Sequence, residues 1–291
     1  MDKFVHIYEV GPRDGLQNEK VIIPTVQKIA LINALSKLGF KRIEATAFVS
    51  AKWVPQMADA SEVLTNIIRE PDVVYGALVP NMIGFEKALE AKADEVAIFA
   101  AASETFSQKN INCSIAESLQ RFAPIIEAAK KRNIRVRGYV SCVAGCPYEG
   151  HIAPKAVADL TAQMLEMGCY EISLGDTIGI GTPLTIEAML ASVLECVPSK
   201  NLAGHYHDTN GQALTNVKVS LDMGLRSFDS AIGGLGGCPY APGAKGNVST
   251  SALANMLLNE GWQTGIDLEG LEKVEIMMGN IMHELEGGID V

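Results

Sequence analysis

Two histidines that lie two positions apart, His205 and His207, are the residues in this sequence best suited to binding a metal ion. They belong to a strand-like segment, Leu202–Asp208, and side chains at alternate positions of a strand project from the same face. Two imidazoles on one face can therefore share a cation. A pair of hydrogen-bonded histidines in the wall of a sheet would give the same pattern, so a metal site needs further ligands.

Asp14 and Asn247 are the residues that could complete this metal site. Asp14 follows the first strand-like segment of the chain, and Asn247 ends a glycine-rich segment after the last one. Two imidazoles, a carboxylate and a carboxamide form a ligand set of nitrogen and oxygen atoms without a thiolate. Such a set favours Mg²⁺ or Mn²⁺ in an octahedral site with positions left for substrate oxygens, and Zn²⁺ or Co²⁺ are the alternatives.

Three further charged residues occupy positions suited to catalysis. Arg13 precedes Asp14 in a turn with glycine on both sides, where a fixed guanidinium can stabilise a developing enolate oxygen or simply form an ion pair. Glu44 lies in an apolar strand-like segment, which is unfavourable unless its carboxylate is paired, so we expect it to bind and orient Arg13. Asp176 ends another strand-like segment.

The segment from Gly233 to Gly246 contains six glycines and two prolines in fourteen residues. This composition suits a hinged lid or a close approach of the backbone to a ligand. It lacks the Gly-Lys-Ser/Thr ending of a P-loop, which argues against nucleotide hydrolysis. Cys238 lies in this segment and could donate a proton when the lid closes, because an unperturbed thiol is mostly protonated at neutral pH. The six cysteines of the chain form no CxxC pair and are expected to be reduced.

A fold that brings these residues together must place the ends of several strands at one edge. Short apolar or β-branched segments alternate eight times with longer segments of helical periodicity. This alternation predicts an α/β protein with a single (β/α)8 TIM barrel, in which residues at the carboxyl ends of the strands face one cavity. The alternative is an open doubly wound sheet. The expected strands are 4–10, 42–48, 73–79, 95–101, 134–141, 170–176, 202–208 and 227–234.

Prolines and glycines mark the expected ends of the helices. A proline in the first turn loses no hydrogen bond, and a glycine readily adopts the left-handed conformation that ends a helix. The prolines are Pro24, Pro154 and Pro183, and the glycines are Gly39, Gly168 and Gly224. A further helical segment, Leu268 to Leu285, falls outside the eightfold pattern. We expect one domain over residues 1–291, with residues 262–291 as a C-terminal helical extension.

The composition excludes several classes of protein. Hydrophobic residues make up 48% of the 291 residues and charged residues 20%, which allows a large core and argues against intrinsic disorder. The formal net charge of -10 disfavours nucleic acids and anionic membranes as partners. No apolar run reaches the roughly 20 residues of a membrane span, and residues 1–10 lack a signal-peptide pattern. We expect a soluble, cytoplasmic protein, and the sequence leaves open whether a transit peptide has been removed.

Five stretches of the sequence resemble the 3-hydroxy-3-methylglutaryl-CoA (HMG-CoA) lyases. They are VGPRDGLQNEK near the N-terminus, IEATAFVSAKWVPQM, SLGDTIGIGTP, GHYHDTNGQAL and GLGGCPYAPGAKGN. The likeness extends over nearly the whole chain. The broader group includes isopropylmalate and homocitrate synthases, which share the RDG turn and the HxH strand. One departure is Asn210, where these lyases usually carry an aromatic residue, and the difference bears on substrate fit.

The resemblance implies a homodimeric, metal-dependent carbon–carbon lyase that cleaves HMG-CoA to acetyl-CoA and acetoacetate in leucine degradation and ketone body formation. It implies a divalent cation, Mg²⁺ or Mn²⁺, and an acyl-CoA substrate. The implied metal ligands are Asp14, His205, His207 and Asn247, and the implied catalytic or substrate-orienting residues are Arg13, Glu44, Asp176, His205 and Cys238. Gln17, in the same turn as Arg13, is expected to bind substrate with it.

Such a cleavage is a retro-Claisen reaction. A base removes the proton of the C3 hydroxyl, the C2–C3 bond breaks, and electrons move into the thioester carbonyl. Arg13 would stabilise the resulting enolate, and Cys238 would protonate it. His205 and Asp14 are both candidates for the base, and the sequence does not choose between them.

Four other functions fit part of the pattern. A Claisen synthase that condenses acetyl-CoA with a 2-oxo acid runs the reverse chemistry, but such enzymes usually carry a further C-terminal region. A lyase for a longer branched 3-hydroxyglutaryl-CoA would differ only in pocket size. A metal-dependent hydrolase would be expected to carry a lysine on the fourth to sixth strands, and the sequence has none there. The last is a barrel that binds metal and acyl-CoA without turnover.

Overall fold

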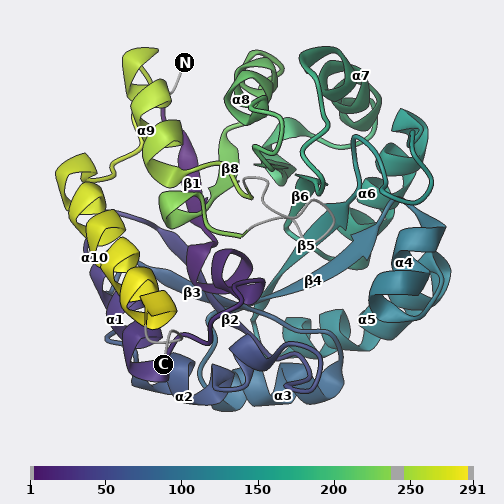
Figure 1. Cartoon of the computed structure of the whole chain (residues 1–291). Coiled ribbons are helices and arrows are strands. Elements are labelled where there is room, and N and C mark those ends of the chain that lie inside the picture. Colours follow the sequence, from purple (N-terminus) through teal and green to yellow (C-terminus); the bar gives the residue numbers. More distant parts are fainter. Residues whose placement is uncertain (1–2, 237–245, 288–291) are drawn as a thin grey trace.

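The computed structural model describes residues 3–236 and 246–287, and its centre is a closed barrel of eight parallel strands (Figure 1). The strands pair in chain order, and the first strand also pairs with the last, which closes the ring. The prediction of a TIM barrel is therefore confirmed, and the alternative of an open sheet is excluded. The strands are β1 (His6–Glu9), β2 (Arg42–Ala47), β3 (Val74–Leu78), β4 (Glu95–Ala101), β5 (Arg135–Ser141), β6 (Glu171–Asp176), β7 (Leu202–Tyr206) and β8 (Ser227–Ser230).

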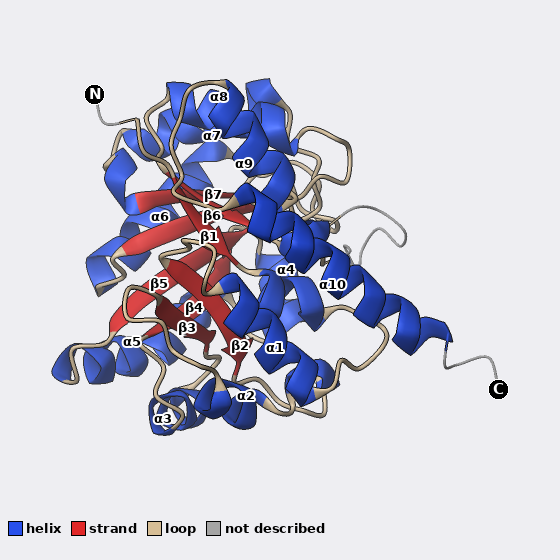
Figure 2. Ribbon diagram, turned by 90° about the vertical axis from the view of Figure 1, so that its left-hand side faces the viewer, coloured by secondary structure: helices blue, strands red, loops and turns tan. Residues whose placement is uncertain are grey.

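Helices cover the outside of the barrel, so that the strands are buried on both faces (Figure 2). The strand residues are therefore mostly buried, including polar ones, and polar and apolar residues alternate along β5, β6 and β8. A helix follows every strand, and two follow β4. These helices are α1 (Thr25–Leu35), α2 (Ala60–Asn66), α3 (Met82–Glu90), α4 (Glu104–Ile111), α5 (Ile115–Lys131), α6 (Pro154–Met167), α7 (Pro183–Leu194), α8 (Ala213–Asp222) and α9 (Thr250–Asn259).

The ends of the helices follow the local chemistry of the sequence. Pro154 and Pro183 are the first residues of their helices, whereas Pro24 lies directly before α1. The three predicted terminal glycines all have positive φ, which fits their place after a helix. At the start of α5, Ser114 and Glu117 each bind the backbone N–H of the other, and this capping box fixes where that helix begins.

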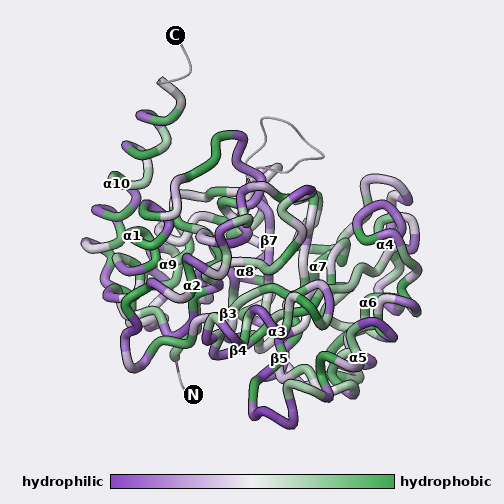
Figure 3. The backbone as a smooth tube through the Cα atoms, turned by 90° about the horizontal axis from the view of Figure 1, so that it is seen from below, coloured by the Kyte–Doolittle hydropathy of each residue, from purple (hydrophilic) through white to green (hydrophobic). Residues whose placement is uncertain are grey.

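The C-terminal helix α10 (Leu268–Gly287) is the helical segment expected beyond the eightfold pattern. It packs against α1 and α9 on the outside of the barrel (Figure 1). Hydrophobic and hydrophilic residues alternate along it, as Figure 3 shows, because only one side is covered. None of the helices within the described ranges is long and apolar enough to cross a membrane.

Two strands end two or more residues earlier than the sequence suggests, and both lead into the rim of the barrel. β7 stops at Tyr206, and the next residue, His207, instead forms an isolated bridge with Asn247. β8 stops at Ser230 and is followed by a tight turn at residues 232–234. The sheet therefore ends before both segments, and His207 pairs with Asn247 outside it.

Candidate active site

The turn after β1 is a π-helical turn, Gly11–Gly15, which places two charged side chains at the rim. Backbone N–H groups of Asp14 and Gly15 both donate to the carbonyl of Val10, at 2.7 and 3.1 Å. Such wide turns are uncommon and occur frequently at functional sites. This one projects Arg13 and Asp14 from adjacent positions into the mouth of the barrel.

Arg13 is held between two carboxylates. Its Nε donates to Oε2 of Glu44 in a short hydrogen bond, and its Nη1 donates to Oδ1 of Asp14 at 2.5 Å. The guanidinium carbon also lies 5.3 Å from the ring centroid of Tyr139. Burial alone would lower the pKa of Arg13, but the charges of Glu44 and Asp14 outweigh it and raise the pKa. The side chain is therefore a fixed, permanent cation, and the expected pairing of Glu44 with Arg13 is present.

The strand pairing explains how Glu44 reaches this position. The register between β2 and β3 shifts between Glu44 and Thr46, so the strand carries a local irregularity at the site. Bulges of this kind re-aim side chains next to active sites. Glu44 is fully buried, and its second oxygen, Oε1, has no hydrogen-bond partner within the described part of the chain.

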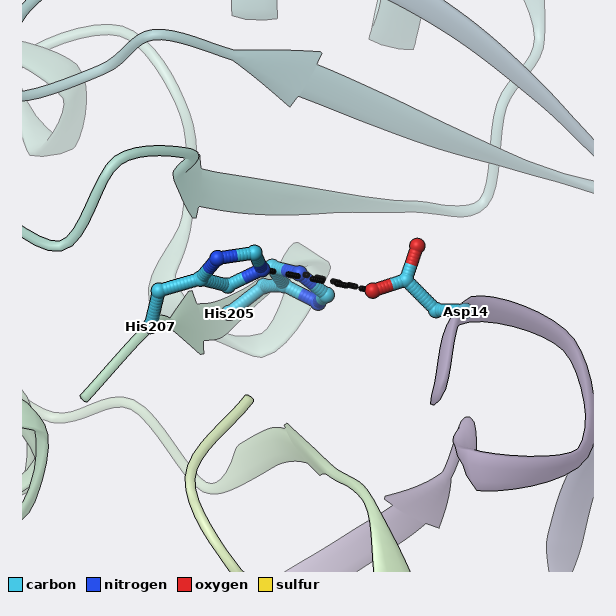
Figure 4. A group of neighbouring side chains, drawn as sticks. All are labelled: Asp14, His205 and His207. Atoms are coloured by element: carbon cyan, nitrogen blue, oxygen red, sulfur yellow. Dashed lines mark ion pairs between the residues drawn. The ribbon is translucent and has the colours of Figure 1, made fainter. Parts of the chain in front are cut away.

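Asp14, His205 and His207 converge on one point, as Figure 4 shows. One ligand atom from each lies within 4.8 Å of the others. Nε2 of His205 is 3.8 Å, and Nε2 of His207 4.0 Å, from Oδ2 of Asp14. These distances are too long for hydrogen bonds, yet two ligands each about 2.1 Å from one cation lie at most about 4.2 Å apart. The donor set and its spacing therefore fit a divalent cation.

The two histidines have different surroundings. Nδ1 of His205 lies 3.1 Å from Oδ2 of Asp229, whereas Nδ1 of His207 is buried and has no partner among the described residues. Burial alone would lower the pKa of His205, but the hydrogen bond with Asp229 and the charge of Asp14 raise it. Burial and the neighbouring His205 lower the pKa of His207 to about 4. His207 is thus a neutral imidazole near neutral pH, the form that binds metals.

Asp14 stays ionised under all ordinary conditions. Burial would raise the pKa of this carboxyl, but the charge of Arg13, followed by those of the two histidines, lowers it to about 2. A carboxylate that is ionised and faces two imidazole nitrogens is a suitable oxygen ligand for Mg²⁺ or Mn²⁺.

Asn247 lies beside Asp14 and completes the predicted group of four. Its Nδ2 donates to Oδ2 of Asp14 at 2.8 Å and to the carbonyl of Leu235 at 3.2 Å. Ligation of a cation would use the carboxamide oxygen, so the amide would have to turn over. Gly236 has a φ of +101°, and a side chain there would come within 2.7 Å of Nδ2 of Asn247. A glycine at this position thus lets the backbone pass close to Asn247.

Asp176, predicted as a catalytic or substrate-orienting residue, is the last residue of β6. It is fully buried at the end of β6, where its oxygens accept hydrogen bonds from the backbone of Gly181 at 2.8 Å and Ile180 at 3.2 Å. Burial raises its pKa to about 6, although the backbone hydrogen bonds oppose the rise. The carboxylate therefore shapes the loop after β6, and its part in catalysis stays a prediction.

Fewer contacts describe the remaining residues named from the sequence. Gln17 follows the π-helical turn, and its Oε1 is buried without a hydrogen-bond partner within the described ranges. Cys238 lies outside the described residues, so its role stays a prediction. Asn210, the departure noted in the sequence, donates from Nδ2 to the carbonyl of Gly179 at 3.0 Å and links the loops after β6 and β7.

Three residues that surround the site were not predicted from the sequence. Tyr139 packs against Arg13 and lies edge-on to His205, with ring centroids 6.0 Å apart. Asp229 binds His205, and Arg137 binds Asp229. A charged residue inside an apolar strand was the signal that identified Glu44, and the same signal is present at Asp229 and Arg137.

Comparison with known proteins gives a consistent set of similarities. A family model described as HMGL-like matches residues 4–278. The mitochondrial hydroxymethylglutaryl-CoA lyase of Bos taurus is 59% identical over 92% of this chain and 83% of its own length. The cytoplasmic 3-hydroxy-3-methylglutaryl-CoA lyase of Mus musculus is 57% identical over 92% of this chain and 78% of its own length.

Solved structures agree with these relatives. The crystal structure of the HMG-CoA lyase from Brucella melitensis superimposes with a TM-score of 0.95 at 56% identity, covering 96% of this chain and 98% of that one. An HMG-CoA lyase from Acinetobacter baumannii, in complex with coenzyme A and 3-methylmalate, gives a TM-score of 0.92 at 40% identity, covering 97% and 92%.

Proposed function

This chain belongs to the HMGL-like family, and on that premise we propose that it is a carbon–carbon lyase that cleaves HMG-CoA into acetyl-CoA and acetoacetate. One observation carries the proposal: the RDG turn delivers a permanent cation, Arg13, next to a carboxylate and two imidazoles that fit a divalent metal ion. A retro-Claisen cleavage needs an oxygen-binding centre at the hydroxyl and a positive charge at the developing enolate.

The metal site is proposed to consist of Asp14, His205, His207 and Asn247, and to take Mg²⁺ or Mn²⁺. Such a cation, when bound, lowers the pKa of a hydroxyl that coordinates it and orients substrate oxygens. The protein supplies the geometry. Arg13 binds Oδ1 of Asp14, and Oδ2 of the same carboxylate faces the two imidazoles.

Arg13 is proposed to bind the thioester oxygen and to stabilise it as an enolate. Its Nε and Nη1 are engaged by carboxylates, which leaves Nη2 as the group directed at substrate. Because Glu44 and Tyr139 fix the guanidinium, it needs no rearrangement as charge develops on the oxygen. Gln17, close by in the chain and with a buried Oε1, is proposed to bind substrate with it.

The hydroxyl proton has two candidate acceptors, His205 and Asp14. The pKa of Asp14 is about 2, so this carboxylate is a weak base. His205 can accept the proton only through Nε2 when that nitrogen is not bound to the metal ion, so Asp14 and His205 remain alternatives for the base. Cys238 is proposed to return a proton to the acetyl carbon, and Asp176 to act as a catalytic or substrate-orienting group.

Further parts of the proposal come from the relatives. The lyase solved with coenzyme A supports an acyl-CoA substrate for this chain. We propose a homodimer that acts in leucine degradation and ketone body formation. Relatives carry both mitochondrial and cytoplasmic names, and we propose the cytoplasm for this chain.

Incubating the purified protein with HMG-CoA and Mg²⁺ or Mn²⁺, and measuring acetoacetate and acetyl-CoA, tests the function. Both products should form in equal amounts, and EDTA should stop their formation until divalent metal is restored. A parallel reaction with acetyl-CoA and 2-oxo acids, followed by release of free CoA thiol, tests the synthase alternative. Thiol release without acetoacetate formation from HMG-CoA, or full lyase activity in EDTA, would overturn the proposal.

A further inference from the structure

A line of buried charged side chains runs through the barrel interior from the rim to its other end. Asp229 faces His205 at the rim end, and Arg137 binds Asp229 through two parallel hydrogen bonds of 2.7 and 3.0 Å. Arg137 also donates to Glu171 at 2.8 Å, and Arg42 donates to the same carboxylate at 2.7 Å. Four strands contribute to this line below the rim, and none of these four side chains has a part in the proposed chemistry.

Asp229 is fixed from every side. The pairing of β7 with β8 places its Cα opposite that of His205. Its Oδ2 accepts from Ser173 Oγ at 2.7 Å and from Arg137, its Oδ1 also accepts from Arg137, and the residue is 1% exposed. A carboxylate that receives a bidentate guanidinium is ionised and can only accept hydrogen bonds.

That property determines the tautomer of His205. Because Asp229 can only accept, the hydrogen atom between the two residues must sit on Nδ1 of the imidazole. Nε2 of His205 is then the nitrogen with the lone pair, and it is this atom that faces Oδ2 of Asp14 at 3.8 Å. His207 lacks such a support, because its Nδ1 has no partner within the described part of the chain.

We propose that Asp229 is a positioning residue that fixes the ring and the tautomer of His205, so that Nε2 is presented to the metal ion. Arg137 keeps Asp229 in place and, through a 2.9 Å hydrogen bond to the hydroxyl of Tyr139, also supports the ring beneath Arg13. This inference rests on the proposed function, because it assigns His205 as a ligand. A second carboxylate behind a metal-binding histidine is a common arrangement, and its loss typically weakens metal binding.

The competing explanation is that Asp229 only neutralises Arg137. Under that explanation, Asp229→Asn would reduce stability but leave the folded protein with normal metal affinity. Under the proposal, the amide offers N–H donors as well as an oxygen, the constraint on the tautomer of His205 is lost, and metal affinity falls. The two explanations therefore differ in a measurement that does not depend on turnover.

The experiment is a Mn²⁺ titration of the full-length protein by isothermal calorimetry, comparing wild type, Asp229→Asn and Ser173→Ala. We expect Asp229→Asn to weaken Mn²⁺ binding by roughly 10- to 100-fold. Ser173→Ala removes another hydrogen bond to the same oxygen but leaves the contact with His205, and should change affinity less than about threefold. Thermal unfolding of each variant shows which of them are folded. Equal Mn²⁺ affinity in wild type and folded Asp229→Asn would overturn the proposal.

A second measurement decides the matter even if Asp229→Asn does not fold. In metal-free wild-type protein labelled with ¹⁵N-histidine, the resonances of His205, assigned by their loss in His205→Asn, should show the proton on Nδ1. A proton on Nε2 alone would overturn the proposal. Failure of the lyase assay with an intact Nδ1–H tautomer and normal Mn²⁺ binding would instead remove the proposed function and leave the positioning role standing.

Discussion

The rim and the base of the barrel both bury charged side chains, but they satisfy them differently. At the base, Arg42, Arg137 and Glu171 form a network in which every charged group has an ionic partner. At the rim, polar atoms of Glu44, His207 and Gln17 are buried without a partner within the described residues. The imidazoles there approach Asp14 no closer than 3.8 Å.

This difference separates buried charged groups that stabilise the fold from buried polar atoms that a bound ligand can satisfy. Removing a single member of a buried ion network causes a large loss of stability, because the deletion leaves an uncompensated charge. Unsatisfied buried groups are rare in folded proteins and persist where a ligand or ion satisfies them. The rim should therefore control activity, and the base should control stability.

Replacing Arg137 by Met should have the largest effect, on stability. The change leaves Asp229 and Glu171 buried without their shared cation, and we expect the free energy of unfolding to fall by about 3–5 kcal/mol. Urea denaturation followed by circular dichroism measures it. A loss below about 1 kcal/mol would mean that the network at the base does not stabilise the fold, and the proposed difference between base and rim would be wrong.

Replacing Arg13 by Met should have its main effect on activity. The change removes the group that stabilises the enolate, so kcat should fall about 10²- to 10³-fold. Glu44 and Asp14 lose their shared cation, so the melting temperature should also fall, but Mn²⁺ binding should persist because none of the proposed ligands is changed. Assays at saturating HMG-CoA measure the fall, and a variant with nearly normal kcat would remove Arg13 from the mechanism.

Replacing Cys238 by Ser tests the rim without altering the metal ligands. Loss of the proposed proton donor should lower turnover about 10²-fold, with metal affinity near normal. Cys196→Ser, at an exposed cysteine, is the matched control and should keep full activity. If both serine variants turn over HMG-CoA equally well, Cys238 has no catalytic role.

Glu9 is a buried carboxylate outside both groups, and replacing it should have the smallest effect, which is on the pH dependence of stability. Its buried carboxylate accepts from the backbone of Gly11 and Ile232, both at 2.8 Å, and from Thr250 Oγ1 at 2.7 Å. Among the described residues it therefore has neutral donors but no cationic partner. Burial raises its pKa to about 7. The folded protein therefore holds a proton that the unfolded chain releases near pH 4.5, and stability must fall as pH rises through 7.

For Glu9 the expected change in unfolding free energy is about 1 kcal/mol between pH 6 and 8. Glu9→Gln keeps an acceptor oxygen but cannot ionise, and this variant should lose that part of the pH dependence. Parallel urea titrations of both proteins at several pH values measure the difference. Identical pH profiles would show that Glu9 does not titrate in this range.

The sequence predicted the architecture well because the signals were local and repeated. All eight strand segments are present, and α10 begins at the expected Leu268. The convergence of Asp14, His205, His207 and Asn247 also followed, since the carboxyl ends of barrel strands share one rim.

The interior network could not be predicted in the same way. Arg137 and Asp229 are 92 positions apart, and their contact depends on which inward-facing positions lie at the same height once the ring is closed. No local sequence pattern indicates the height of a residue along the barrel axis. The partners of Asp176 were missed for a related reason: they are backbone groups of its own loop, and backbone geometry leaves little trace in residue type.

The seam at which β1 meets β8 has a consequence for how the protein gains its activity. Asp14 follows the first strand of the ring, while His205 and Asn247 come from its last third, so these groups meet only when the ring is complete. A nascent chain still emerging from the ribosome has no metal site of this kind. Divalent cations should accordingly bind and stabilise only the finished molecule.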